Sequence, residues 1–194
     1  VLFAHGSGSS RFSPRNRFVA HSLNRGGFAT LLIDLLTAEE DEIDQMTRQM
    51  RFDIPLLVQR LVDILDWMSA DATVRALPVG LFGASTGAAA ALIAAAQRPG
   101  VVQAVVSRGG RPDLAASVLA QVRAPTLLIV GERDPAVLDL NREALAQLTG
   151  ERDLVTVPGA THLFEEPGTL EQVAAAATAW FRRHVQRRSQ RSSV

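Results

Sequence analysis

Serine, aspartate and histidine occur along this chain in an order and context that suit nucleophilic catalysis. The segment Gly83-Ala84-Ser85-Thr86-Gly87 lies between an apolar run and an alanine-rich stretch, which predicts a sharp turn from a strand into a helix. The backbone of such a turn is strained and its neighbours must be small, and the two glycines meet that need. We therefore predict that Ser85 is a nucleophile, with a simple helix N-cap as its alternative role.

A serine nucleophile needs a base, and the base needs an acid that orients it. Asp134 follows the apolar run 126–130, and His162 follows the run 154–157. Serine, acid and histidine in this chain order are typical of hydrolases built on an α/β sheet. The sequence predicts a Ser85–Asp134–His162 triad, with Glu132 as the alternative acid. Asp134 also precedes a proline, so a helix cap is its alternative role.

The glycine-rich segment after the first apolar run is suited to binding an oxyanion. His5-Gly6-Ser7-Gly8 follows the run 1–4, and its glycines allow the backbone to approach a neighbouring turn closely. An oxyanion hole needs N–H groups from two such loops. We predict the N–H groups of Ser7 and Thr86 for this role, and we expect His5 to hydrogen-bond the loop into shape rather than to act as a base.

Three arginines follow predicted strands on the same side of the sheet as these residues. Arg11 and Arg15 come after the glycine-rich loop, and Arg108 comes after the run 101–106. Guanidinium groups bind carboxylates and phosphates well, so we predict that these arginines bind the substrate. The alternative is that they anchor loops through ion pairs, for example with Asp34.

Short apolar runs alternate with longer stretches of helical spacing. The runs that predict strands are 1–4, 28–36, 79–82, 101–106, 126–130 and 154–157. The stretches that predict helices are 15–25, 54–70, 86–97, 136–148 and 169–185. This alternation favours an α/β fold with a mostly parallel, doubly wound sheet, helices on both faces and no lid domain. Residues 37–54 break the alternation and are expected to form a solvated excursion or a flap.

The composition excludes several classes of protein and of site. The chain has 194 residues, 47% of them hydrophobic, which suits one domain with a sizeable core. Without cysteine there is no disulfide, thiolate zinc site or cysteine nucleophile. Twenty arginines balance 20 acidic residues, so we expect no nucleic acid and no membrane as partners. We predict neither a cofactor nor a metal, and a small-molecule ester as substrate.

The ends of the chain suggest how its domain is bounded. We expect a single domain over residues 1–186 and a basic, polar tail over 187–194. Val1 begins an apolar run without any lead-in, so strands upstream of it are expected to be missing from this chain. We expect a cytoplasmic protein, although a signal peptide lost with those strands would leave no trace here.

Several longer stretches resemble a known superfamily. They are AHGSGSSRFSPRNR, LLIDLLT, GASTGAAAAL, SRGGRPDL, APTLLIVGERD and VPGATHLFEEPG. Together they resemble the α/β-hydrolases, in particular small dienelactone-hydrolase-like enzymes and a bacterial domain sometimes joined to a phosphoribosyltransferase. The resemblance implies an α/β-hydrolase fold, Ser85, Asp134 and His162 as the triad, and a fused or associated phosphoribosyltransferase as partner.

The same resemblance bears on the reaction. Dienelactone hydrolases proper use a cysteine nucleophile, whereas this chain has serine and no cysteine. We therefore expect a serine hydrolase that cleaves carboxylic esters, lactones or thioesters through an acyl-enzyme, and the alternative is a non-catalytic interaction module with this fold. A dinucleotide-binding loop around Gly6 and Gly8 is a weaker alternative, because Arg11 stands where the third glycine should be.

Overall fold

The computed structural model describes residues 1–185, and the predicted tail 187–194 lies outside them. In this part of the chain six strands form one sheet in the order β2-β1-β3-β4-β5-β6, and all neighbouring strands are parallel. The strands are β1 (Leu2–Ala4), β2 (Leu31–Leu32), β3 (Val79–Ala84), β4 (Val102–Arg108), β5 (Thr126–Gly131) and β6 (Arg152–Val157). The predicted doubly wound α/β class is confirmed.

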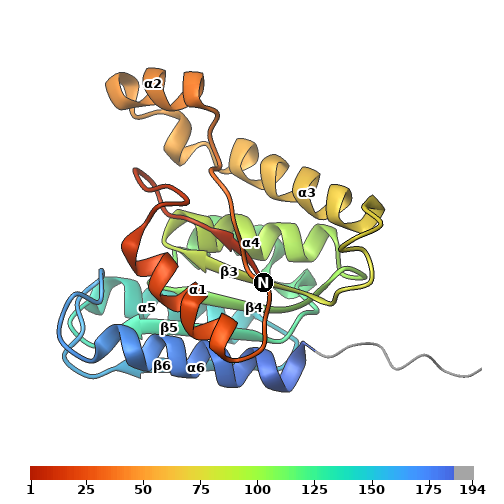
Figure 1. Cartoon of the computed structure of the whole chain (residues 1–194). Coiled ribbons are helices and arrows are strands. Elements are labelled where there is room, and N and C mark those ends of the chain that lie inside the picture. The colour runs from red at the N-terminus through yellow and green to blue at the C-terminus, as the bar shows by residue number, and fades with distance from the viewer. Residues whose placement is uncertain (186–194) are drawn as a thin grey trace, which may run out of the picture.

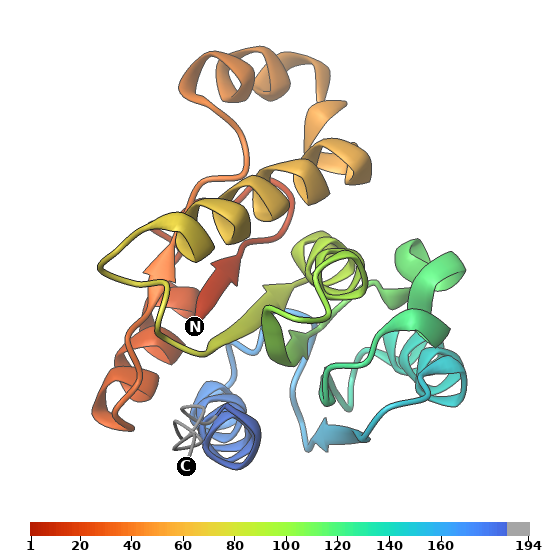
Figure 2. The ribbon, with the colours of Figure 1, turned by 90° about the vertical axis from the view of Figure 1, so that its right-hand side faces the viewer.

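Helices cover both faces of the sheet (Figures 1 and 2). Helices α1 (Pro14–Arg25) and α6 (Thr169–His184) pack together on one face. The other face carries α3 (Ile54–Ala70), α4 (Thr86–Gln97), the 3₁₀ helix η2 (Pro112–Gln121) and α5 (Pro135–Gln147). The two faces bury separate apolar clusters, and this explains why the central strands are apolar on both sides.

Helix α4 begins directly after Ser85, and its small side chains determine how close it lies to the sheet. The alanines over residues 88–91 are fully buried, and they contact α3, η2 and the central strands. Side chains this small let a helix axis approach a sheet closely. The N-terminus of α4 is thereby held directly after β3, where Ser85 lies.

The strand order places a topological switch point between β1 and β3. From β1 the chain passes through α1 to β2 on one side, and it then crosses back through α3 to β3 on the other side. In open α/β sheets ligands bind at the carboxyl ends of the strands at such a point. The glycine-rich loop that follows β1 and the turn that follows β3 both lie there.

One sequence prediction is corrected in the segment after α1, and the structure shows which elements form the excursion that follows. The run 28–36 forms only a two-residue strand, β2, because it lies at the sheet edge and pairs with β1 alone. The expected excursion 37–54 is largely helical and contains α2 (Ala38–Thr47) and the 3₁₀ helix η1 (Met50–Phe52). A reciprocal capping box between Thr37 and Glu40 starts α2. Figure 1 shows α2 beyond the end of α3, away from the sheet.

Among residues 1–185, no helix combines the length and the apolar character needed to cross a membrane. Nor does any group of three or more His, Asp or Glu side chains in this part of the chain have the arrangement of a metal site.

Candidate active site

Ser85 sits at the turn between β3 and α4 with an unusual backbone conformation. Its φ is 51° and its ψ is −121°, a conformation that costs a non-glycine residue about 1–3 kcal/mol. Ser85 occupies the N-cap position of α4, but its side chain makes no capping hydrogen bond to the helix. A strained serine whose hydroxyl does not serve its helix is the arrangement of a nucleophile elbow.

The glycines on either side of Ser85 are required by close packing. A Cβ atom at Gly87 would overlap the carbonyl oxygens of Ala4 and His5, and one at Gly83 would overlap Ala88. A side chain at either position would push α4 away from β1 and β3. The structure therefore shows why the residues around Ser85 must be small: close backbone packing leaves no room for a side chain at these two positions.

His162 and Asp134 come together from the loops after β6 and β5. The His162 Nδ1–H donates a hydrogen bond to Asp134 Oδ2 at 2.6 Å. The Asp134 carboxylate makes no capping hydrogen bond to α5, although Pro135 starts that helix. Asp134 therefore stands at the N-cap position of α5, but its carboxylate hydrogen-bonds the His162 ring and not the helix. The hydrogen bond leaves Nε2 of His162 as the nitrogen that can accept a proton.

Two glutamates hold the loop that carries His162. Glu132, the alternative acid, accepts a hydrogen bond from the Gly159 N–H at 2.8 Å and so ties this loop to the end of β5. Glu166 accepts one from the Thr161 N–H at 3.1 Å. Hydrogen bonding by Thr161 holds the pKa of Glu166 below its ordinary value. Both carboxylates therefore position the histidine loop, whereas Asp134 contacts the ring itself.

The segment after β4 links Ser85 to His162. The Ser85 N–H donates to the Arg108 carbonyl at 3.2 Å, and the Arg111 N–H donates to the Ser85 carbonyl at 3.2 Å. Between these two arginines, a Cβ at Gly109 would lie 3.5 Å from the His162 ring. The serine backbone and the histidine ring thus border the same short segment. The three residues of the predicted triad thus follow strands at the carboxyl edge of the sheet. His162 is hydrogen-bonded to Asp134, whereas the Ser85 hydroxyl makes no hydrogen bond to His162.

The glycine-rich loop lies against the nucleophile turn, with one difference from the prediction. A Cβ at Gly6 would lie 3.0 Å from Ser85 Cβ, so the loop approaches as closely as expected. The Ser7 N–H, however, donates to Thr86 Oγ1 at 3.0 Å and is already paired. The Thr86 N–H belongs to the first residue of α4, and such groups have no acceptor within their helix.

His5 is a structural residue in this loop. Its Nε2 accepts a hydrogen bond from the Leu35 N–H at 3.0 Å, and its Nδ1–H donates to the Gly6 carbonyl at 2.9 Å. The ring is buried, and burial lowers the pKa of His5 below its ordinary value. Both ring nitrogens are used in joining the loop to the chain after β2, as expected for a histidine that shapes the loop.

The three predicted arginines differ in their partners. Arg11 is anchored by Asp34, which accepts from its N–H at 2.6 Å and from its Nη1 at 2.8 Å. Arg15 pairs with Glu165 at 3.0 Å. Arg108 is buried and makes no ion pair with any described residue. The anchoring alternative thus describes Arg11 and Arg15, and Arg108 is the exception.

A pocket of about 760 Å³ is lined in part by the glycine-rich loop, and none of the three predicted triad residues belongs to its lining. Gly6 and Ser7 belong to its lining, and its apolar walls include Leu32, Leu36, Leu57 and Ile64. Three arginines and three aspartates line it: Arg11 pairs with Asp34, Arg51 pairs with Asp44, Arg60 pairs with Glu40 outside the lining, and Asp41 accepts a hydrogen bond from Gln45. The pocket is therefore close to neutral and suits an uncharged group.

Two functional features were missed by the sequence analysis. One is Arg51, which forms an ion pair with the buried Asp44. The Nη1 of Arg51 would lie 3.0 Å from a Cβ at Gly8, so Arg51 joins the α2 segment to the glycine-rich loop. The other is Glu165, three residues after His162, which reaches Arg15 on α1. Arg51 lies in none of the stretches quoted above. Glu165 lies in VPGATHLFEEPG, but its pairing with a residue 150 positions away leaves no local signal.

The chain is similar to known proteins over most of its length. The chain matches the model of the "Dienelactone hydrolase family" over residues 10–187. Two Mycobacterium tuberculosis proteins, each named "Putative phosphoribosyl transferase", are 60% identical over 185 residues, which is 95% of this chain. The match covers 41% of their length, so this chain spans about two fifths of those curated relatives.

Solved structures with a similar fold include a dienelactone hydrolase and the protein Est1E. The crystal structure of a dienelactone hydrolase from Anabaena variabilis is 60% identical, has a TM-score of 0.94, and aligns with 95% of this chain over 86% of its own. Est1E from Butyrivibrio proteoclasticus is 17% identical, with a TM-score of 0.79 over 94% of this chain and 86% of its own. At 17% identity, the similarity to Est1E is a similarity of fold.

Proposed function

The chain belongs to the dienelactone hydrolase family, and from that premise we propose that it is a serine hydrolase that cleaves carboxylic esters through an acyl-enzyme. Lactones and thioesters, which present the same electrophilic carbonyl, are included in the proposed substrate class. The observation that carries the proposal is the 2.6 Å hydrogen bond between His162 and Asp134 beside a strained Ser85. The family membership supports hydrolysis in general, and this geometry supports serine as its nucleophile.

In the proposed acylation step, Ser85 Oγ attacks the ester carbonyl carbon while His162 Nε2 accepts the hydroxyl proton. Asp134 holds the ring in the tautomer that leaves Nε2 free, and its charge stabilises the imidazolium that forms. The tetrahedral intermediate collapses when the C–O bond to the alcohol breaks. His162 gives its proton to the departing alkoxide, and the acyl group remains on Ser85.

The negative charge on the carbonyl oxygen of the intermediate needs donors. The Thr86 N–H is one proposed donor, and the positive end of the α4 dipole supports it. The Ser7 N–H is the other, and it must exchange its present acceptor, Thr86 Oγ1, for the oxyanion. Because this N–H lies 3.0 Å from an oxygen on the residue after the nucleophile, the exchange needs only a small movement.

Deacylation repeats the same steps with water as the nucleophile. His162 Nε2 takes a proton from water, which attacks the acyl carbonyl and releases the acid and Ser85. We assign one arm of the substrate to the near-neutral pocket beside the glycine-rich loop, because its apolar walls favour an uncharged group. The name of the curated relatives supports a phosphoribosyltransferase domain, fused or associated, as the partner of this hydrolase.

A fluorophosphonate probe tests the proposal, since only an activated serine reacts with it. Wild-type protein is expected to label at Ser85 and to hydrolyse 4-nitrophenyl esters of short acyl chains. Ser85→Ala should abolish labelling and lower kcat by about 10³- to 10⁶-fold with the fold retained. Ser9→Ala, in the neighbouring loop, is the matched control and should label normally.

The same experiment addresses the alternative of a non-catalytic module. Absence of both labelling and ester hydrolysis in folded wild-type protein would favour that alternative. Labelling that maps to Ser7, Ser9 or Ser10 would show that the nucleophile lies in the glycine-rich loop, and the assignment of Ser85 would then be wrong.

A further inference from the structure

The pocket beside the glycine-rich loop keeps part of its apolar lining in contact with solvent. Its aliphatic lining comes from β2, from the chain after it and from α3, and it includes Leu32, Ile33, Leu36 and Ile64. These four side chains are only partly buried. An occupant that removes such surface from water gains free energy in proportion to the area covered, so the pocket favours an apolar ligand.

The segment after β2 forms one side of this pocket. Ala38, Asp41 and Asp44 of α2 belong to the lining, together with Arg51 of η1. Asp44 is buried, and it accepts hydrogen bonds from the Arg51 N–H at 3.1 Å and from the Arg51 side chain. Because Arg51 also borders Gly8, this ion pair holds the α2 segment against the glycine-rich loop.

The pocket begins next to the proposed nucleophile. Gly6 and Ser7 belong to its lining, and a Cβ at Gly6 would lie 3.0 Å from Ser85 Cβ. In the proposed acyl-enzyme the carbonyl carbon is bonded to Ser85 Oγ. A group that extends from that carbon across the glycine-rich loop therefore enters the pocket.

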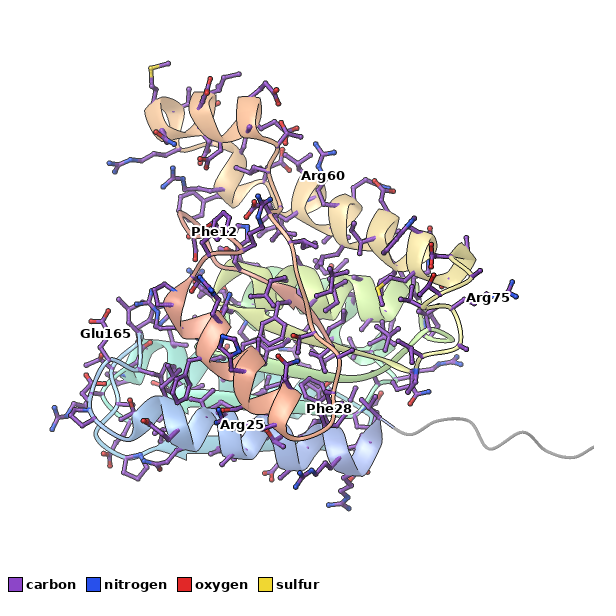
Figure 3. All side chains as sticks on the ribbon, viewed as in Figure 1. Phe12, Arg25, Phe28, Arg60, Arg75 and Glu165 are labelled. Carbon is purple, nitrogen blue, oxygen red and sulfur yellow. The ribbon has the colours of Figure 1, made fainter. Side chains whose placement is uncertain are left out.

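The position of His162 decides which arm of an ester extends in that direction. The oxygen of the departing alcohol takes its proton from His162 Nε2, so the alcohol must lie on the histidine side of Ser85. His162 follows β6 at one edge of the sheet, whereas the pocket is lined by the chain after β1 and β2 at the other edge. In Figure 3, Phe12 and Arg60 from the pocket lie toward α2, and Glu165 from the histidine loop lies toward β6. The acyl arm is therefore the one that reaches the pocket.

We propose that this pocket binds the acyl chain of the substrate, and that this chain is uncharged, aliphatic and of medium length, such as octanoyl. The volume of about 760 Å³ lies within the range of about 300–1,000 Å³ for pockets that enclose small organic ligands, and an acetyl group would leave most of it to water. The proposal rests on the proposed ester hydrolysis and narrows its substrates to esters of such acids.

Two isomeric esters test which arm the pocket holds. Methyl octanoate and heptyl acetate have the same atoms, and the same heptyl chain lies on the acyl side of one and on the alcohol side of the other. The readout is the ratio of their kcat/KM values, measured by titrating the acid released at constant pH. Each methylene fully removed from water favours binding by about 4-fold, so methyl octanoate should be preferred by about 10-fold or more.

Ala38→Phe obstructs the pocket without disturbing the core, because Ala38 lines the pocket and is exposed. This variant should lower the ratio to about 1 to 3, since most of the methylenes lose their place in the pocket. Ala70→Phe is the matched control: Ala70 is an exposed residue at the end of α3 outside the lining, and the ratio should stay as in wild type. A ratio near 1 in wild type that Ala38→Phe does not change would overturn the acyl pocket. A preference for heptyl acetate that Ala38→Phe removes would show that the pocket holds the alcohol, and would overturn the assignment as well.

Binding of octanamide to the Ser85→Ala protein separates this proposal from that of ester hydrolysis. Calorimetric titration should show saturable binding that Ala38→Phe weakens by about 10-fold or more and that Ala70→Phe leaves unchanged. Such binding in a protein that neither hydrolyses esters nor reacts with a fluorophosphonate would refute the hydrolase and leave the pocket for an uncharged chain standing. Absence of saturable binding to folded Ser85→Ala protein would overturn the acyl pocket by itself.

Discussion

Asp134→Asn tests the proposed acid against its neighbour Glu132, and the structure sets the size of the effect. The Asp134 carboxylate accepts the His162 Nδ1–H at 2.6 Å and caps no helix. An amide in its place can donate to the ring, which then keeps its proton on Nε2 and cannot accept one from Ser85. We expect kcat to fall by about 10³- to 10⁴-fold, or about 4 to 5.5 kcal/mol of transition-state stabilisation.

Glu132→Gln is the matched control, since it makes the same chemical change two residues away. Glu132 accepts the Gly159 N–H and contacts no catalytic group, so kcat should change by less than about 3-fold. Exchanging a charged for a neutral acceptor should instead lower the free energy of unfolding by about 1 kcal/mol.

Steady-state ester hydrolysis and urea denaturation measure the two effects separately. A loss of activity in Glu132→Gln as large as in Asp134→Asn would refute the reasoning, and so would near-normal turnover by Asp134→Asn. In either case the 2.6 Å hydrogen bond would not be the one that orients the base.

Two further predictions concern stability. Gly87→Ala should lower the free energy of unfolding by about 3 kcal/mol or more in urea denaturation, because its Cβ would overlap backbone carbonyls. The control is Gly100→Ala, since a Cβ at Gly100 meets nothing within 4 Å. Equal losses of stability in the two variants would contradict the packing argument. Burial lowers the pKa of His5 from its ordinary value of 6.5, so the folded state favours the neutral ring. The contribution of His5 to the free energy of unfolding is therefore complete above pH 6.5 and should be lost as the pH falls toward the folded-state pKa. In His5→Gln this part of the pH dependence of the free energy of unfolding should disappear. If the free energy of unfolding changes with pH as steeply in His5→Gln as in wild type, His5 is not the source of that dependence.

The sequence was sufficient to determine the fold class and the positions of several site residues. Apolar runs bounded by Gly, Pro or Asp predicted the central strands, because a strand buried on both faces must be apolar throughout. Helices 54–70 and 86–97 have the predicted bounds. Gly83 and Gly87 marked the nucleophile turn for a local steric reason that needs no knowledge of the rest of the fold.

Other features depended on the tertiary structure. The run 28–36 is apolar enough for a long strand, yet only its pairing at the sheet edge fixed β2 at two residues. The helix α2 is polar on most of its surface, so periodicity gave no signal for it. The Ser7 N–H is a free donor by sequence, and only the approach of Thr86 gives it an acceptor.

The arginines illustrate this division most clearly. Arg11, Arg15 and Arg108 are equivalent in sequence, because each follows a strand on the site side of the sheet. In the folded protein Asp34 pairs with Arg11, Glu165 pairs with Arg15, and no described carboxylate reaches Arg108. Hydrophobic periodicity is a local property that reports burial, whereas the pairing of charges depends on side chains brought together from distant parts of the chain. The sequence could therefore name the three cations, and only the fold decided which of them form ion pairs.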